Sequence, residues 1–322
     1  MKNKIILICG DVHSINSEII CKMWKKINKK IKKNLYLITN YEIFKSQIKE
    51  LGFKIGLEQV ENIKEESKFD KLQIININLK FKNSFKVSQK ENSNFVINSL
   101  NYGHKLALDK SVKGIINCPI DKKLLKKTKK IGVTEFLASK NNVKNDSEVM
   151  LIHNKKLSVA PITTHIKINH IDRKIKKDLL IKKINTLHTN FKYLFNKYPK
   201  IAILGLNPHN SELNKNSKEV KIIKPIVNKL QKKGIKINGP YAADTIFIEN
   251  YKKYDVIVGM YHDQVLGPFK TIFKFDAINI TLGLKYIRVS PDHGTAKNLI
   301  KKNKASPLSL LRCVDFINKI NK

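Results

Sequence analysis

Three histidines follow apolar segments that have the composition of buried strands. His165 comes after LSVAPITT, His209 after IAILGLNP, and His262 after YDVIVGMY. Ligands of an open parallel sheet collect beyond the carboxyl ends of its strands, so these imidazoles are expected at one edge. Neutral imidazoles from separate loops bind zinc, nickel, cobalt or similar ions and leave positions open for a substrate. The pattern predicts a divalent metal site.

An ordinary role for these histidines has to be weighed against the metal site. A single loop histidine is more often a solvated or hydrogen-bonded residue, and no HExxH motif is present to support a metal. The chain has nine histidines. Four of the others lie in helical or turn contexts and two more follow strands: His104, His153, His170, His188, His13 and His293. The argument for metal binding is that three histidines occupy equivalent positions after strands.

Elements that could position these residues alternate along the 322-residue chain. Short runs rich in Val, Ile and Leu without strict alternation indicate strands buried on both faces. Strands are expected at 5–9, 35–39, 72–77, 114–118, 157–162, 201–206, 256–260, 278–282 and 286–290. Helices are expected over about 17–31, 175–198, 225–233 (ending at Gly234) and from Ser306 onward. This alternation predicts an α/β fold with a largely parallel sheet.

Charge and cysteine content restrict the partners and the compartment. The net charge is +37, yet only Arg173, Arg288 and Arg312 are arginines, and the lysines are spread along amphipathic helices. Readers of base sequence favour arginine, so specific nucleic-acid binding is not expected, although loose binding to polyanions is. Four cysteines without CxxC spacing, a short N-terminal apolar run and the lack of a membrane-length apolar stretch favour a cytoplasmic protein.

Five segments resemble signature segments of the 4-hydroxythreonine-4-phosphate dehydrogenase family of vitamin B6 biosynthesis. They are TTHIKI (163–168), GLNPHNSE (205–212), NGPYAADTIF (238–247), MYHDQ (260–264) and INITLGLKYIRVSPDHGTA (278–296). They occur in the order found in the family, at closely similar spacing, over nearly the whole chain. As a set they are highly specific.

The resemblance implies two α/β/α lobes, as in the isocitrate and isopropylmalate dehydrogenases, with the active site in the cleft between them. Residues 1–125 with 291–322 would form the nucleotide-side lobe, and 126–290 the lobe with metal, substrate and dimer contacts. The implied cofactors are NAD or NADP and one divalent ion such as Zn, Mg or Co. The implied assembly is a homodimer whose shared active site takes its third metal ligand, His262, from the partner subunit.

The same resemblance assigns roles to individual residues. His165, His209 and His262 match metal ligands. The positions that match substrate-binding residues are Thr134, Lys270, Asn279 and Arg288. The segment DHGTA resembles a nucleotide-binding segment and gives His293, Gly294 and Thr295 as cofactor contacts, although such a segment is also a tight turn that opens a helix. Asp244 and Asp263 are candidates to hold imidazole tautomers.

These residues suit the oxidation of a phosphorylated hydroxy-amino acid. Lys270 supplies a point charge and Arg288 a planar fork for phosphate and carboxylate groups. We expect oxidation of 4-phosphooxy-L-threonine to a β-keto acid, which loses CO₂ to give 3-amino-2-oxopropyl phosphate. The alternatives are a family relative that oxidises another phosphorylated four-carbon hydroxy acid, and a non-catalytic polyanion-binding protein.

Several positions depart from the family pattern. The usual GHTE reads GVTE, so Val133 replaces a histidine that touches the substrate. The N-terminal loop GDPAGIGPE reads GDVHSINSE, NPHAGE reads NPHNSE, and HDQGL reads HDQVL. The metal-binding histidines are unchanged. A different substrate within the family is therefore a second hypothesis, next to drift in a genome of biased composition.

Overall fold

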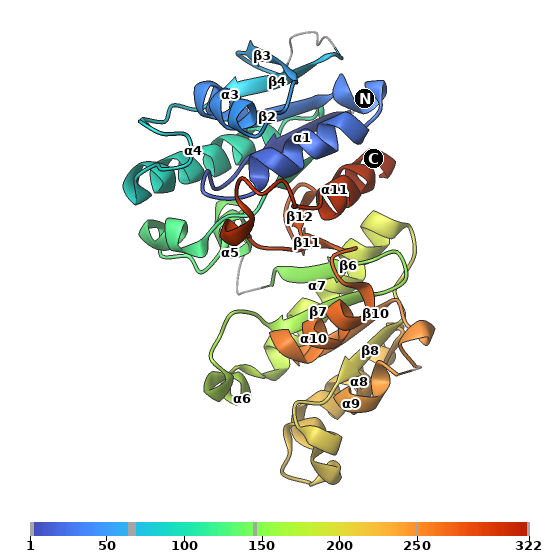
Figure 1. Cartoon of the computed structure of the whole chain (residues 1–322). Coiled ribbons are helices and arrows are strands. Elements are labelled where there is room, and N and C mark those ends of the chain that lie inside the picture. Colours follow the sequence, from blue (N-terminus) through green and yellow to red (C-terminus); the bar gives the residue numbers. More distant parts are fainter. Residues whose placement is uncertain (1–2, 64–68, 144–146, 249, 321–322) are drawn as a thin grey trace. The chain divides into compact units, whose positions relative to one another are not determined.

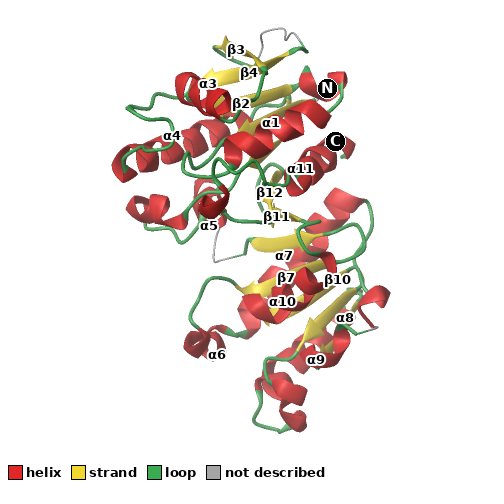
Figure 2. Ribbon diagram, viewed as in Figure 1, coloured by secondary structure: helices red, strands yellow, loops and turns green. Residues whose placement is uncertain are grey.

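A computed structural model describes residues 3–63, 69–143, 147–248 and 250–320 and divides the chain into two compact units (Figure 1). The first unit comprises Met1–Asn141 and Lys285–Lys322, and the second comprises Asn142–Leu284. Both units combine a sheet with helices, as Figure 2 shows by colour. The predicted α/β fold is therefore confirmed.

The described sheet of the first unit is parallel throughout. Its order is β3 (Gly56–Val60), β4 (Lys71–Asn76), β2 (Leu35–Thr39), β1 (Lys4–Ile8), β5 (Val112–Asn117) and β12 (Arg288–Pro291). The central strands β1 and β2 are almost entirely buried. Continuous apolar runs such as KIILI and LYLIT suit strands that are covered on both faces.

The helices of the first unit pack along this sheet. They are α1 (Asn16–Lys26), α2 (Lys29–Lys32), α3 (Tyr41–Glu50), α4 (Gln89–Ala107), α5 (Val133–Lys140) and α11 (Leu308–Lys319), with the 3-10 helices η1 (Lys122–Thr128) and η6 (Lys297–Leu299). Helix α1 lies beside α3 and α11, whereas α4 packs against β1 and β5 (Figure 1). Within the expected helical range 17–31, the apolar residues Ile20, Met23, Trp24, Ile27 and Ile31 are all buried. Ser17 lies inside α1, and its hydroxyl donates to the side chain of Gln47.

The sheet of the second unit is mixed. Its order is β11 (Ile278–Leu282), β6 (Val149–His153), β7 (Ser158–Thr163), β10 (Val256–Tyr261), β8 (Ile201–Leu204) and β9 (Ile237–Tyr241). β6 runs antiparallel to β11 and β7, and the remaining pairs are parallel. The carboxyl ends of β7, β10 and β8 therefore lie at the same edge.

The two longest described helices of the second unit, α7 (Lys177–Phe195) and α10 (His262–Phe273), pack against its sheet. Its other helices are α6 (Ile171–Lys174), α8 (Lys224–Gln231) and α9 (Ala243–Ile246), with short segments η2 (Ile168–His170), η3 (Pro208–Leu213), η4 (Glu219–Ile223, π-helical) and η5 (Asn250–Lys253). Val265, Leu266 and Phe269 of α10 join a buried core with residues of β6, β7, β8 and β10. Gly234, where the helix at 225–233 was expected to end, has φ +81° and lies three residues after α8, in the left-handed conformation that is common after helices.

The unit boundaries differ from the expected 125 and 290. Residues 126–141 belong to the first unit because η1 and α5 pack with α4, where Ser93 Oγ donates to the carbonyl of Leu124. Residues 285–290 belong there because β12 pairs with β5. Thr134 and Arg288 were expected in the second lobe and lie in the first unit. No helix in the described ranges is long and apolar enough to span a membrane.

Candidate active site

His165 and His262 lie close together at the edge of the second sheet. β7 and β10 are neighbours, and their last residues, Thr163 and Tyr261, are paired with each other. His165 follows β7 by two residues at φ +47°, and His262 follows β10 directly. Their ring centroids are 5.8 Å apart. Two of the three predicted metal ligands are thus brought together within one protomer.

His262 is the first residue of helix α10, and not a loop residue as the sequence suggested. Its Nδ1 lies 2.6 Å from Oδ1 of Asp263, the predicted orienting carboxylate. This contact leaves Nε2 as the ring nitrogen available to a metal. Lys270 lies two turns further along α10 and has its ammonium 5.6 Å from the ring centre of Phe275.

His209 lies in a loop of unusual backbone conformation. All five residues from His209 to Leu213 have positive φ, between 48° and 60°, and none is glycine. Left-handed conformations cost L-residues about 1–2 kcal/mol each, so the surrounding structure must enforce this turn. Nε2 of His209 lies 3.6 Å from Oδ2 of Asp244, the other predicted carboxylate, and both side chains are largely exposed.

Gln264 connects the two histidine-bearing segments. Its side chain is buried, Oε1 accepts the backbone N–H of Met260 at 2.7 Å, and Nε2 donates to the carbonyl of Gly205 at 2.8 Å. The first contact lies at the end of β10, before His262, and the second lies at the start of the His209 loop. Sequence reasoning missed this residue, although it stands in the quoted MYHDQ segment. The sequence did contain a signal for it, because Gln264 is a polar residue directly before the apolar residues Val265 and Leu266.

The three histidines fit a metal site only in part. Among the described residues, no group of three or more His, Cys, Asp or Glu side chains is arranged to hold a metal ion within one chain. The spacing of His165 and His262 suits two ligands of one ion, but His209 does not join them as a third. A complete set of protein ligands would need a donor from elsewhere.

Asn279 lies on β11, opposite Ile152 of β6. Its Oδ1 is buried and has no hydrogen-bond partner among the described residues. Buried polar atoms in native proteins usually have a partner. The unpaired oxygen is consistent with the predicted role in binding a ligand.

Arg288 and Thr134 lie together in the first unit. Arg288 is buried, its Nε donates to Oδ1 of Asn117 at 2.7 Å, and its Nη1 lies 3.3 Å from Oγ1 of Thr134. Burial lowers the pKa of Arg288 to about 10, so its guanidinium stays charged at neutral pH. Two predicted substrate contacts are therefore neighbours, and Asn117, which sequence reasoning did not single out, orients the arginine.

The predicted cofactor segment, His293 to Thr295, is anchored to the N-terminal loop. The backbone N–H of Ile15 donates to the carbonyl of Thr295 at 3.2 Å. A Cβ on Gly294 would meet no atom within 4 Å, so there is open space beside this backbone. Nδ1 of His293 lies 3.0 Å from the carbonyl of Gly294. This open space is a feature that the predicted nucleotide-binding turn would need.

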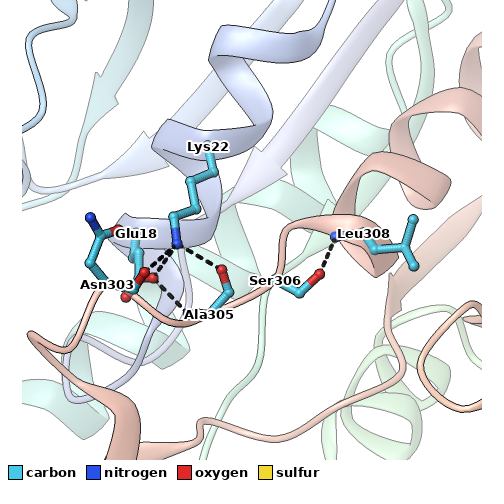
Figure 3. Close-up of polar contacts among 6 residues, drawn as sticks. All are labelled: Glu18, Lys22, Asn303, Ala305, Ser306 and Leu308. Atoms are coloured by element: carbon cyan, nitrogen blue, oxygen red, sulfur yellow. Dashed lines mark hydrogen bonds and ion pairs between the residues drawn. The ribbon is translucent and has the colours of Figure 1, made fainter.

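A second connection joins α1 to the chain that precedes α11, and Figure 3 shows it. Oε1 of Glu18, which is 1% exposed, accepts the backbone N–H of Ala305 at 2.8 Å. Nζ of Lys22 donates to the same oxygen and to the carbonyls of Asn303 and Ala305. The start of α1 is thus joined to the C-terminal part of the first unit at two places. Ile15 binds Thr295 of the predicted cofactor segment, and Glu18 and Lys22 bind the chain at 303–305.

Comparisons with known proteins agree with this architecture. The family model of the pyridoxal phosphate biosynthetic protein PdxA matches residues 30–317. The 4-hydroxythreonine-4-phosphate dehydrogenase of Sulfurihydrogenibium sp. (strain YO3AOP1) is 36% identical over 97% of each chain. The D-threonate 4-phosphate dehydrogenase of Pectobacterium atrosepticum is 34% identical over 64% of each. The crystal structure of the 4-hydroxythreonine-4-phosphate dehydrogenase from Klebsiella pneumoniae superposes with a TM-score of 0.84, at 25% identity over 98% of each chain.

The extent of these matches settles the class of protein. The family model spans most of the chain, and the Sulfurihydrogenibium relative aligns nearly end to end. The alternative of a non-catalytic polyanion-binding protein is therefore wrong. The chain belongs to the 4-hydroxythreonine-4-phosphate dehydrogenase (PdxA) family of enzymes.

Proposed function

We propose that the protein oxidises 4-phosphooxy-L-threonine with NAD or NADP in a reaction that depends on a divalent metal. The hydroxyl-bearing carbon loses a hydride to the nicotinamide, and its hydroxyl oxygen loses a proton to solvent. The resulting β-keto acid loses CO₂ to give 3-amino-2-oxopropyl phosphate. The observation that carries the proposal is the 5.8 Å separation of His165 and His262 at two adjacent strand ends, in a chain of this family.

Charged and polar residues in each unit have roles in this proposal. Arg288 and Thr134 would bind an anionic group of the substrate, with Asn117 fixing the guanidinium plane. Lys270 would supply a second positive charge, and the unpaired Oδ1 of Asn279 would accept a hydrogen bond from the substrate. His293, Gly294 and Thr295 would contact the nucleotide beside the open space at Gly294.

His165, His209 and His262 would hold the metal in a homodimer. A bound divalent ion would lower the pKa of the substrate alcohol and polarise the ketone that forms. The two imidazoles that lie near each other need a third donor, and no three-donor group exists in the described part of one protomer. A site shared with a second copy meets this need. Asp263 would keep Nε2 of His262 free of a proton by holding its Nδ1–H.

The cytoplasm is the proposed location. Cys9, Cys21, Cys118 and Cys313 are buried free thiols. Burial raises the pKa of Cys9 to about 12, which makes this thiol unreactive. Such cysteines suit a reducing compartment.

A second candidate substrate follows from one relative and one substitution. The Pectobacterium relative is named for D-threonate 4-phosphate, a phosphorylated four-carbon hydroxy acid without an amino group. In this chain Val133 begins helix α5, directly before Thr134, where the family pattern has a histidine. A hydrocarbon at this position changes the polar contacts available to the substrate. This second candidate predicts that the enzyme prefers the acid that lacks the ammonium group.

A direct comparison of the two substrates tests the proposal. The purified protein is incubated with NAD or NADP and a divalent metal, separately with 4-phosphooxy-L-threonine and with 4-phospho-D-threonate. We expect a higher kcat/KM for the amino acid. A higher value for the threonate would establish the second candidate, and failure with both, while the Sulfurihydrogenibium enzyme is active, would reject both. Val133→His then tests whether this position sets the preference.

A further inference from the structure

We propose that Glu219 is a positioning residue that holds the loop carrying His209 in its left-handed conformation. Glu219 begins the π-helical segment η4, ten residues after His209, and is fully buried. It lies outside the left-handed loop in the sequence, and it is buried whereas most of the loop residues are exposed. The inference depends on the proposed function in one respect, the metal-binding role of His209.

The Glu219 carboxylate binds the backbone at the start of this loop. Oε1 accepts the N–H groups of Leu206 and Asn207, each at 2.8 Å. The side-chain amide of Asn207 donates to both carboxylate oxygens, at 3.2 and 3.3 Å. Hydrogen bonds to an ionised acceptor are stronger than those between neutral groups. The two amides lie immediately before Pro208 and His209, so the carboxylate fixes the direction in which the chain enters the left-handed turn.

The turn itself has a backbone that needs such support. Five consecutive non-glycine residues have positive φ, and this conformation is unfavourable for each of them. Nδ2 of Asn210 donates to the carbonyl of Pro240 at 3.1 Å, and Nε2 of Gln264 donates to the carbonyl of Gly205. These two contacts hold the loop from the sides of β9 and α10. Glu219 holds the segment between them.

Glu212 is a matched control within the same chain. It lies in the left-handed turn itself, carries the same side chain, and is exposed where Glu219 is buried. Replacing either residue by alanine removes one negative charge from the segment that follows His209. Any difference between the two variants therefore reports the hydrogen bonds of Glu219 and not the local charge.

Hydrogen exchange of the metal-free protein, followed by NMR or by mass spectrometry with residue resolution, tests the inference without an activity assay. Glu219→Ala should speed exchange at the amides of Leu206 and Asn207 by roughly 10–100-fold, the value expected for a lost hydrogen bond to a charged group. Glu219→Gln keeps an acceptor for these amides and should show a smaller change. Glu212→Ala should match the parent. The amide of Gly205, which bonds the carbonyl of Tyr241, should stay protected in every variant.

Steady-state kinetics provide a second measurement. If His209 acts as proposed, Glu219→Ala should lower kcat by about 10–100-fold, the range seen when partners that orient a ligand are lost, and Glu219→Gln should recover part of it. Unchanged exchange at Leu206 and Asn207 in folded Glu219→Ala overturns the inference. Faster exchange with full activity keeps the structural role of Glu219 and instead contradicts the role of His209. If the alanine variant fails to fold, Glu219→Asp takes its place in both measurements. This variant keeps the carboxylate on a side chain that is one methylene shorter, so the carboxylate no longer reaches the amides.

Discussion

The side-chain amide of Gln264 donates to the carbonyl of Gly205 at 2.8 Å, joining helix α10 to the loop after β8. Its oxygen accepts the N–H of Met260 at the end of β10. One buried side chain thereby fixes the start of the helix that carries His262 relative to the loop that carries His209. The relative placement of these two histidines should depend on this amide.

Gln264→Leu should lower kcat/KM by about 10–100-fold, because residues that orient metal ligands have effects of this size. The matched control is Gln231→Leu. Gln231 also donates to a backbone carbonyl, that of Ile237. Ile237 is the first residue of β9, so this contact lies at the amino ends of the parallel strands, opposite to the edge with the histidines. We expect that variant to lose some stability and keep its activity. Equal activity losses in the two variants would assign Gln264 a purely structural role.

Sequence patterns predicted most of the strands whose residues form a continuous apolar run. The apolar runs at 35–39 and 278–282 coincide with β2 and β11. Strands β3 (GLEQV) and β9 (INGPY) were missed because one is polar and partly exposed and the other contains glycine and proline. β6 (VMLIH) was missed although its apolar run could have been found.

For the candidate site, the spacing after strands identified His165 and His262, and the structure places them side by side. Their supports, Gln264 and Glu219, could not be predicted in the same way. Each acts through hydrogen bonds to backbone atoms of a segment that is distant in sequence or bent into a left-handed turn. Such contacts exist only after the chain has folded. A polar residue between apolar helix positions could have singled out Gln264, but it would not have identified the atoms that Gln264 binds.

The Glu18–Lys22 pair predicts a stability difference between two lysines on one helix. Lys22→Met would leave the buried carboxylate of Glu18 without its cation, at a cost of about 2 kcal/mol in the free energy of unfolding. Lys26→Met, on an exposed position of the same helix, should change it by less than about 0.5 kcal/mol. Urea unfolding of both variants measures the difference. Equal stabilities would show that the pair contributes nothing.

His153 predicts a loss of stability in mild acid. Burial, with a smaller contribution from Lys197, lowers the pKa of His153 to about 4, whereas the unfolded chain titrates near 6.5. Between these values the unfolded state binds the proton and the folded state does not. Stability is therefore full above about pH 6.5 and falls as the pH drops toward 4, by up to about 3 kcal/mol.

Unfolding measured from pH 7.5 to 4.5 tests this prediction, with His153→Phe as the comparison. The variant lacks the titrating ring and should show a shallower decline over this range. Identical declines in the two proteins would show that other groups, and not His153, govern acid stability.

Mixed dimers test whether the metal site is shared. Pairs of the inactive variants His165→Ala, His209→Ala and His262→Ala are co-expressed with different tags, and the heterodimers are isolated. If one histidine comes from the partner, the two mixtures that contain its variant should regain one intact site per dimer. The resemblance predicts that the common variant is His262→Ala, whereas the 5.8 Å spacing of His165 and His262 within one protomer predicts His209→Ala. Activity in none of the three isolated heterodimers would contradict a shared site.

The most direct test of the account follows reduced nicotinamide and CO₂ together in one reaction. The purified enzyme receives 4-phosphooxy-L-threonine and NAD or NADP, first after treatment with a chelator and then with a divalent metal restored. The account predicts no turnover after chelation and, with metal, one CO₂ for each nicotinamide reduced. Turnover that persists without metal, or reduction of nicotinamide without release of CO₂, would contradict it.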